Sequence, residues 1–423
     1  MHILTQLIKE DMKPALGVTE PGAIAFAVST ARSYMKGEVQ KVFLRLNSGM
    51  FKNAFTCGIP GSSSVGNYHA AALGAVAANP KKGLECLDGI TEDEATKARQ
   101  MVNQGKITVD MSEITSRIFI EAKVVGENSE VTVTIRDAHT NIVEITKNGK
   151  VVFEKQQKME DQKEKGHLIH KFTLEQLYNY ANTVAVEEIQ FIKKAYKMNW
   201  ELLQEGIHSP RTTYAAYLIA ANGGKMVSKD EHRTASLFCN AAIEARVIGL
   251  SRPAMSITGS GAHGIIATMP LFAAYKVNGY MEEALLRATA LSYLVCMYIK
   301  EYSGKLSAFC GCAIAAGTGM ACGLVSLRGG NTEIMAKTIN NMASSITGII
   351  CDGGNQGCTM KGVVAVDAAY SAVNMAMHDV YISNIHGING ATPEETMRNM
   401  GLIASPGMVE TEKMIVEILK RKN

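Results

Sequence analysis

Two pairs of cysteines that enclose glycine carry the strongest chemical signal in this sequence. Cys310 and Cys312 enclose a single glycine, and Cys351 and Cys358 enclose a glycine-rich segment. Thiolates at such spacings can converge on one metal centre, and glycine leaves backbone N–H groups free to hydrogen-bond to sulfur. A structural zinc site usually has four closed ligands and a Cys-x-x-Cys pair, which is absent here. The spacing therefore favours an iron–sulfur cluster with three cysteine ligands and one open iron.

The other cysteines indicate the compartment. The chain has nine cysteines, an odd number that would leave one thiol unpaired in an oxidising compartment. Cys86, Cys239, Cys296 and Cys322 are typical of buried free thiols that pack as small hydrophobic residues, which is also the alternative for the four cysteines of the two pairs. The N-terminus lacks the basic stretch and apolar core of a signal peptide. We therefore expect a cytoplasmic protein without a disulfide framework.

The charge balance excludes several classes of partner. In 423 residues there are 43 Lys and Arg against 40 Asp and Glu, a net charge of +3, so nucleic acid is not an expected partner. Residues 53–80, 253–275 and 306–327 contain no charged side chain and are long enough to cross a membrane. Gly, Ser, Thr, Asn or Pro interrupts each of them, so we expect no membrane partner. These stretches are more typical of the glycine-rich inner walls of a globular protein that binds a small molecule.

Motifs spread over nearly the whole chain resemble a known family. They are Gly17-Val18-Thr19-Glu20-Pro21, Gly58-Ile59-Pro60-Gly61, Ser256-Ile257-Thr258-Gly259-Ser260-Gly261, Leu306-Ser307-Ala308-Phe309-Cys310-Gly311-Cys312-Ala313, Ile350-Cys351-Asp352-Gly353 with Gly357-Cys358, and Ile403-Ala404-Ser405-Pro406-Gly407-Met408. Together they resemble the iron–sulfur-dependent L-cysteine desulfidases. These enzymes are related to the helical, alpha-chain-like part of the iron–sulfur L-serine dehydratases. The chain is similar to a divergent member of this family.

The resemblance implies a cofactor and a reaction. The cofactor is a 4Fe-4S cluster held by three cysteines, with the fourth iron free for substrate. Carried onto this sequence, Cys351 and Cys358 are two ligands. The third is Cys310 or Cys312, of which Cys310 matches the dehydratases better. The open iron would act as a Lewis acid on the leaving thiolate or hydroxide while a base removes the Cα proton. The resulting aminoacrylate hydrolyses to pyruvate and ammonia, and no pyridoxal phosphate is expected.

The sequence departs from the desulfidase pattern at three places. Val18 stands where the desulfidases have a cysteine, whose thiol at a helix N-terminus could act as a base or sulfur carrier. Residues 62–69 bring three serines and His69 in place of Gly, Thr and apolar residues, and His263 stands where Asn-Gln is usual. We interpret the three changes as one rebuilt substrate pocket, which has lost a thiol and gained imidazoles and hydroxyls.

The rebuilt pocket supplies the candidate site residues. His69 or His263 could replace the missing base because either imidazole titrates near neutral pH; the alternative is a core histidine bonded to backbone carbonyls. Glu20 could hold the substrate ammonium, with stabilisation of the first helical turn as the alternative. The substrate-binding candidates are Ser62, Ser63, Ser64, Asn67 and Ser260. The three consecutive serines could donate to the substrate carboxylate, or they could form a polar turn.

Two further segments receive no catalytic role. The motif at 259–264 has the glycines of a dinucleotide-binding loop, but it lacks the strand–helix unit and acidic residue that such a site needs. Residues 137–139, which include His139, lie between predicted strands and are interpreted as a turn.

The elements that must position these residues fall into two groups. Residues 117–154 alternate as strands separated by turn residues, among them Asn148-Gly149, which predicts an antiparallel meander. Before it we expect helices at 4–12 and 20–34, the second with Thr19 as N-cap, and a strand at 41–47. Residues 154–165 carry eight charges in twelve positions and predict a domain boundary.

Nearly everything beyond this boundary has the pattern of helices. The predicted helices are 174–204, 211–222, 231–250, 281–302, 313–327, 331–347, 363–378, 393–400 and 407–420. The fold class is therefore α+β, with a small antiparallel-sheet domain at residues 1–165 followed by a large, mostly α-helical, cluster-binding domain at residues 166–423.

These patterns predict a lyase of amino-acid catabolism. It would eliminate a β-hydroxy or β-thio group from a small amino acid, acting as a carbon–sulfur or carbon–oxygen lyase in the cytoplasm. The composition is compatible with a homodimer. The loss of the thiol at Val18 leaves serine, threonine, cysteine and related substrates open. The alternative is a catalytically degenerate family member that binds or regulates without a cluster.

Overall fold

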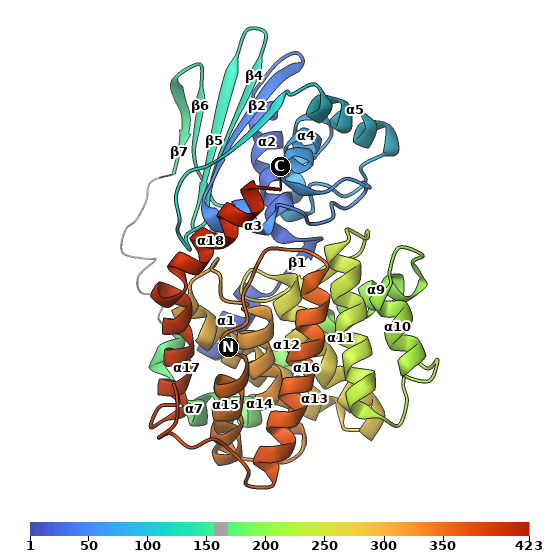
Figure 1. The fold of residues 1–423 in the computed structure, drawn as a ribbon, viewed down its shortest axis with the longest axis vertical. Coiled ribbons are helices and arrows are strands. Elements are labelled where there is room, and N and C mark those ends of the chain that lie inside the picture. The colour runs from blue at the N-terminus through green and yellow to red at the C-terminus, as the bar shows by residue number, and fades with distance from the viewer. Residues whose placement is uncertain (156–167, 423) are drawn as a thin grey trace.

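The computed structural model describes residues 1–155 and 168–422. Only the first two residues of the predicted boundary at 154–165 belong to this range, so the rest of that prediction lies outside the described residues, and the division at residue 165 stays a prediction. Figure 1 shows a sheet with short helices at one end of the molecule and a bundle of helices at the other. The predicted α+β class is confirmed.

A six-stranded sheet forms the smaller part. Its strand order is β3-β2-β4-β5-β6-β7. The strands are β2 (Val39–Leu46), β3 (Ile107–Met111), β4 (Phe119–Gly126), β5 (Glu130–Arg136), β6 (Ile142–Lys147) and β7 (Lys150–Glu154). The four last strands form the predicted antiparallel meander. At one edge the sheet is mixed, because β3, a strand that was not predicted, pairs parallel with β2 after a long helical crossover.

The crossover and the N-terminal helices cover one face of this sheet. They are α2 (Thr19–Ser33), α3 (Ser48–Asn53), α4 (Gly66–Val76), the 3-10 helix η1 (Pro80–Glu85) and α5 (Glu92–Asn103). Helix α2 packs on β4 and β5 and on α4, and is therefore buried along most of its length. Gly74 permits this approach, because a Cβ there would lie 2.8 Å from the carbonyl oxygen of Ala25.

The start of α2 differs from the prediction. Its N-cap is Val18, whose side chain cannot cap, and Thr19 is already the first helical residue. The Thr19 hydroxyl donates instead to the carbonyl oxygen of Gly259, 3.2 Å away, in the helical part. The predicted N-cap at Thr19 is wrong because this long-range partner takes its hydroxyl.

The larger part consists of helices around α11. The helices after residue 167 are α7 (Leu174–Thr183), α8 (Val186–Ile189), α9 (Lys193–His208), α10 (Tyr214–Ala221), α11 (Glu231–Val247), α12 (Gly261–Asn278), α13 (Glu282–Ser303), α14 (Gly317–Leu327), α15 (Thr332–Ile346), α16 (Gly357–Met377), α17 (Pro393–Leu402) and α18 (Val409–Lys420). Helix α11 contacts α9, α10, α12 and α16. The predicted helix at 174–204 is interrupted, because the backbone is extended at Val184 and Ala185.

Helix α12 was not among the predicted helices. This helix lies in the uncharged stretch at 253–275 and is buried on nearly every side. A helix that is hydrophobic all round has no polar face, so its sequence lacks the amphipathic period by which helices are recognised. The uncharged stretch at 306–327 similarly contains a π-helical turn at Cys312–Ala316 and helix α14.

The N-terminus crosses to the helical part. Helix α1 (Ile3–Asp11) packs on α13, and strand β1 (Lys13–Leu16) pairs antiparallel with β8 (Pro253–Ser256). Helix α18, near the C-terminus, contacts α3 below the sheet (Figure 1). Both ends of the described chain therefore connect the two parts.

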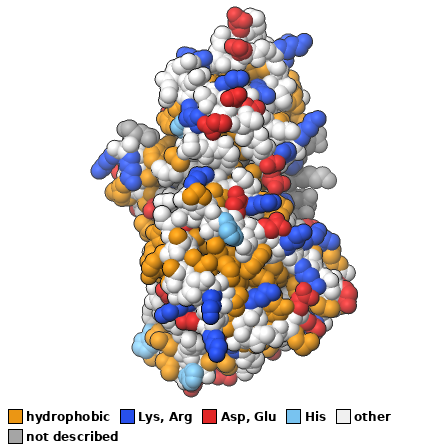
Figure 2. Space-filling view, turned by 90° about the vertical axis from the view of Figure 1, so that its right-hand side faces the viewer, with side chains coloured by type: hydrophobic (Ala, Val, Ile, Leu, Met, Phe, Trp, Pro, Cys, Tyr) orange, Lys and Arg blue, Asp and Glu red, His pale blue; other side chains and the backbone are white. Residues whose placement is uncertain are grey.

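Charged and hydrophobic side chains are distributed unevenly over the surface. Figure 2 shows one face, on which hydrophobic side chains gather over the helical part and charged ones are frequent over the sheet. Among the helices of the described residues, none has both the length and the apolar character needed to cross a membrane.

Candidate functional site

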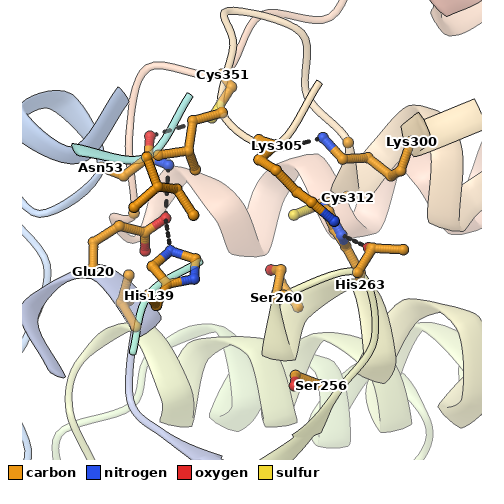
Figure 3. A pocket seen from close by; sticks show the side chains of 18 of the residues that line it. Glu20, Asn53, His139, Ser256, Ser260, His263, Lys300, Lys305, Cys312 and Cys351 are labelled. Atoms are coloured by element: carbon orange, nitrogen blue, oxygen red, sulfur yellow. Dashed lines mark hydrogen bonds and ion pairs between the residues drawn. The ribbon is translucent and has the colours of Figure 1, made fainter. Parts of the chain in front are cut away.

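A cavity of about 200 Å³ lies between the sheet part and the helical part. The sheet part contributes the start of α2, the end of α3 and the turn between β5 and β6. The helical part contributes the end of α11, the segment from β8 into α12, the end of α13 and both cysteine segments. Residues from at least seven segments thus meet at one place (Figure 3).

The two cysteine segments lie side by side at this cavity. Cys312, Cys351 and Cys358 line it, and Cys310 is buried next to Cys312. The backbone N–H of Cys310 donates to the carbonyl of Ile349 at 3.0 Å, and the N–H of Cys351 donates to the carbonyl of Ala308. These two bonds align the segments as a short antiparallel bridge.

Lys52 at the end of α3 holds both segments. Its Nζ donates to the carbonyl oxygens of Ser307 at 3.0 Å and Cys351 at 2.7 Å, and lies 3.1 Å from the Glu412 carboxylate on α18. Burial lowers the pKa of Lys52, but the neighbouring Cys351 and Glu412 outweigh burial and raise it. The lysine is therefore a buried cation beside the cysteines.

Burial and the neighbouring sulfurs shift the pKa values of Cys310, Cys312 and Cys358. A hydrogen bond joins the side chains of Cys310 and Cys312: it lowers the pKa of Cys310 to about 6 and raises that of Cys312 well above its ordinary value. Burial raises the pKa of Cys358 to about 11, and the neighbouring Cys351 adds to this rise. Burial and the neighbouring sulfurs thus disfavour the thiolate forms of Cys312 and Cys358, which a bound metal centre would relieve by taking them as thiolates.

The donor set, four thiols with buried lysines beside them, has the chemistry of a thiolate-bound centre. Within residues 1–155 and 168–422, no three His, Cys, Asp or Glu side chains lie close enough together to hold one metal ion. The cations Lys52, Lys300 and Lys361 lie near these thiols and would balance the negative charge of a thiolate-bound cluster.

Gly311, between the first two cysteines, has a packing role. A Cβ at this position would lie 2.7 Å from His263 Nε2 and 2.9 Å from Lys300 Cδ. The Cys-Gly-Cys segment can therefore approach both side chains only because its central residue is glycine. This contact brings His263 to the wall of the cavity that the thiols line.

His263 is buried and neutral. Its Nδ1 lies 2.5 Å from the hydroxyl oxygen of Thr258. Burial lowers the pKa of His263 well below its ordinary value, and the charges of Lys300 and Arg246 lower it further. The expectation that this imidazole titrates near neutral pH is therefore wrong for His263, because burial and the two neighbouring cations disfavour its charged form. A neutral imidazole at the cavity wall can still accept a proton from a bound molecule, although as a weaker base than an exposed histidine.

Glu20 lies across the cavity from His263 (Figure 3). Its carboxylate accepts a hydrogen bond from Asn53 Nδ2 at 2.9 Å and lies 3.8 Å from His139 Nε2. Burial raises the pKa of Glu20, but His139, Asn53 and the charge of Arg246 together lower it to about 2. The cavity therefore contains a fixed negative charge.

The structure brings together part of the predicted site. Glu20, Ser260, His263 and three of the four cysteines line the cavity, and Val18 lines it as well. The residues of the serine-rich stretch do not. Their side chains contact neighbouring groups instead. His69 Nδ1 is 2.9 Å from the carbonyl oxygen of Val65, and Asn67 Nδ2 donates to the carbonyl of Phe51. Ser62 Oγ accepts from the N–H of Ser64, and Ser63 Oγ accepts from Arg99.

Sequence reasoning missed several residues of the cavity. His139 is in a turn, as expected, but the β5–β6 turn carries it to Glu20. Asn53, Arg246, Lys300 and Lys305 also line the cavity. No local pattern marks them, because each is a single polar residue in an ordinary segment and only the fold brings them together.

Comparison with known proteins decides the family. The sequence model of the family described as "Serine dehydratase alpha chain" matches residues 81–417, which include all four cysteines of the site. The chain belongs to the serine dehydratase alpha chain family. The predicted resemblance is confirmed at this level, and membership indicates a serine dehydratase-like protein.

Full-length relatives support the same family. A UPF0597 protein of Clostridium botulinum strain Okra is 39% identical, and the match covers 99% of this chain and 98% of the relative. A UPF0597 protein of Caldanaerobacter subterraneus subsp. tengcongensis is 36% identical with the same coverage. A second UPF0597 protein of the Okra strain is 32% identical over 98% of this chain and 96% of its own length. This serine dehydratase alpha chain relative is thus similar to these proteins from end to end.

Proposed function

We propose that this member of the serine dehydratase alpha chain family is a lyase. It eliminates the β-substituent of a small β-hydroxy or β-thio amino acid and releases a keto acid, ammonia, and water or sulfide. One observation carries the proposal: a cavity of about 200 Å³ has several cysteines on one wall and an ionised carboxylate, Glu20, on another. Its size suits a small amino acid.

The cysteines are proposed to hold a 4Fe-4S cluster. Its ligands would be Cys351, Cys358 and one thiol of the Cys310–Cys312 pair. Access to the cavity favours Cys312, and the lowered pKa favours Cys310. When bound, the cluster supplies a Lewis-acidic iron that polarises the leaving group of the substrate. Iron content of the two single Cys→Ser variants decides between the two thiols.

Glu20 is proposed to bind the substrate ammonium. The carboxylate is ionised and almost excluded from water, so it interacts strongly with a cation that enters the cavity. The hydrogen bond from Asn53 holds one of its oxygens in place. His139 lies on the same side and borders the ammonium position.

His263 is the proposed base. Thr258 at Nδ1 orients the imidazole and leaves Nε2 near Gly311 on the cavity wall. Nε2 takes the proton from Cα, the electrons of the C–H bond form the Cα–Cβ double bond, and the Cβ–O or Cβ–S bond breaks. The leaving group departs with its electron pair. The aminoacrylate product tautomerises to an imine, which water hydrolyses to the keto acid and ammonia. His69 receives no role because it lies outside the cavity.

The compartment and assembly are part of the proposal. Reduced thiols persist in the cytoplasm, so an enzyme with this cysteine site is proposed to act there. The pairing of two copies stays a prediction, since the described structure is one chain.

The experiment is a substrate screen on protein purified and reconstituted without oxygen. Both enantiomers of serine, threonine and cysteine are offered, and keto acid release is measured. We expect keto acid from at least one of them. A cluster-loaded chain that releases keto acid from none would overturn the proposal. It would favour a binding protein that keeps the fold, an alternative that Val18 supports by placing an inert side chain in the cavity.

A further inference from the structure

Arg246 is a buried cation without a hydrogen-bond partner for its Nε. It lies near the C-terminal end of α11 with 4% of its surface exposed, and it lines the cavity. Among the described residues, nothing accepts a hydrogen bond from this buried Nε. Burying a guanidinium donor without an acceptor costs free energy, so the arrangement calls for an anion that enters from the cavity.

The start of α12 adds a second anion-binding feature at the same place. Ser260 is the N-cap of this 18-residue helix, and its side chain makes no capping hydrogen bond. The first N–H groups of a helix have no intrahelical partner and carry partial positive charge. Ser260, Ala262 and His263 all line the cavity together with Arg246. The hydroxyl and these amides are therefore available to a ligand.

Gly261 joins the two features. A Cβ at this position would lie 2.6 Å from Arg246 Nε and 3.0 Å from the Ala254 side chain. The guanidinium therefore reaches the first turn of α12 only because residue 261 has no side chain. Glycine at this point makes a cradle that a larger residue would fill.

The cavity has both an anionic and a cationic side chain, which together suit a zwitterionic ligand. Glu20 is a fixed anion, and Arg246 lies near enough to help lower its pKa. No ion pair within 4.0 Å joins the two among the described residues, so a ligand can interact with both. An α-amino acid carries an ammonium and a carboxylate on one carbon, which matches a carboxylate and a guanidinium on neighbouring walls.

We propose that Arg246, Ser260 and the first amides of α12 bind the α-carboxylate of an amino acid whose ammonium lies at Glu20. This inference rests on the proposed function for the identity of the ligand as an amino acid. It assigns to Arg246 the contact that the sequence analysis gave to Ser62, Ser63 and Ser64. An Arg fork matches the two oxygens of a carboxylate.

Binding of unreactive probes tests the proposal. L-Alanine and L-alaninamide lack a β-leaving group and differ only in the carboxylate, and the D forms cover the opposite stereochemistry. Ligand-observed NMR on full-length protein prepared without oxygen gives their affinities. We expect one alanine enantiomer to bind at least about tenfold more tightly than its amide, because the amide lacks the charge that strengthens the hydrogen bonds.

Variants of Arg246 test whether this residue causes the tighter binding of alanine than of its amide. Arg246→Gln is expected to abolish this preference. Arg246→Lys is expected to keep part of it, since lysine retains the charge but not the fork. The matched control is Arg233→Gln, an exposed arginine on the same helix. An Arg246→Gln variant with native melting temperature and native preference would overturn the proposal, as would a native chain without any preference.

A second variant covers the case in which Arg246→Gln does not fold. Gly261→Ala places a methyl group 2.6 Å from Arg246 Nε, which is too close, and the flexible arginine can shift away from it. We expect this variant to fold and to lose most of the preference for alanine over the amide. An unchanged preference would contradict the proposal.

The test separates this inference from the proposed function. Carboxylate-dependent binding in a chain that releases no keto acid from any amino acid would contradict the proposed lyase activity and support the carboxylate site. Keto acid release without carboxylate-dependent binding would support the lyase activity and contradict the carboxylate site.

Discussion

Glu20 is ionised at a place where an isolated carboxylate would be unfavourable. With 6% of its surface exposed, it keeps its charge because Asn53 donates to it and His139 and Arg246 lie nearby. Its position at the start of α2 was compatible with a simple role in stabilising the first helical turn. The cavity gives it a second role, because its carboxylate faces the space that the cysteines border.

The substitution Glu20→Gln tests this role. It keeps the size of the side chain and removes the charge, so the substrate ammonium loses a charge-assisted hydrogen bond of about 1.5–3 kcal/mol. We expect KM for the amino acid found in the substrate screen to rise about 10–100-fold. Steady-state kinetics measure this, with the exposed Glu38→Gln as control. An unchanged KM would remove Glu20 from the substrate site.

Some residues of the site could be predicted from the local sequence, and others could not. The cysteines could be singled out because four residues of one reactive type form two pairs that enclose glycine. His139 and Arg246 could not, since each is one polar residue in a plain turn or helix. The serine-rich stretch has the composition of a ligand loop, yet it does not line the cavity. Ser62 and Ser63 accept hydrogen bonds from Ser64 and Arg99 in and around the turn.

At the scale of the elements, glycine between two cysteines decides how closely three segments approach. The substitution Gly311→Ala would place a methyl group 2.7 Å from His263 Nε2. Overpacking of this kind costs about 1–3 kcal/mol, and here it also displaces the proposed base. We expect a lower melting temperature and a loss of activity of at least about tenfold.

The matched control for this variant is Gly348→Ala. Nothing lies within 4 Å of a Cβ at residue 348, which is exposed and precedes the second cysteine segment. Thermal unfolding and keto acid release are measured for both variants. Equal behaviour of the two would show that the space at residue 311 has no importance for the site.

Lys52 connects α3, α18 and both cysteine segments. The substitution Lys52→Met leaves Glu412 buried without its cation and removes two hydrogen bonds to backbone carbonyls. Loss of one partner of a buried pair destabilises a protein by about 3–5 kcal/mol. We therefore expect a lower free energy of unfolding in urea.

Two further variants interpret that result. The double variant Lys52→Met with Glu412→Leu should recover part of the loss, because no buried charge is then left unpaired. Lys413→Met, on the exposed side of α18, should leave stability nearly unchanged. A Lys52→Met variant as stable as the native chain would contradict the connecting role.

For the whole molecule, the sequence predicted the α+β class and the antiparallel meander, because alternating residues and Asn148-Gly149 are local signals. It missed β3 as a parallel edge strand and α12 as a helix. The first depends on a crossover that returns beside β2, and the second has no polar face. The cavity between the two parts was beyond local patterns, since it requires β1 and β8 to pair and α18 to reach α3.

The most direct measurement is the iron and acid-labile sulfide content of protein reconstituted without oxygen. We predict about four of each per native chain, little in Cys351→Ser, and the native content in Cys239→Ser, whose sulfur is buried in α11 away from the cavity. A native chain without iron, or a Cys351→Ser variant with the full content, would contradict the proposal that this cavity is a cluster-dependent lyase site.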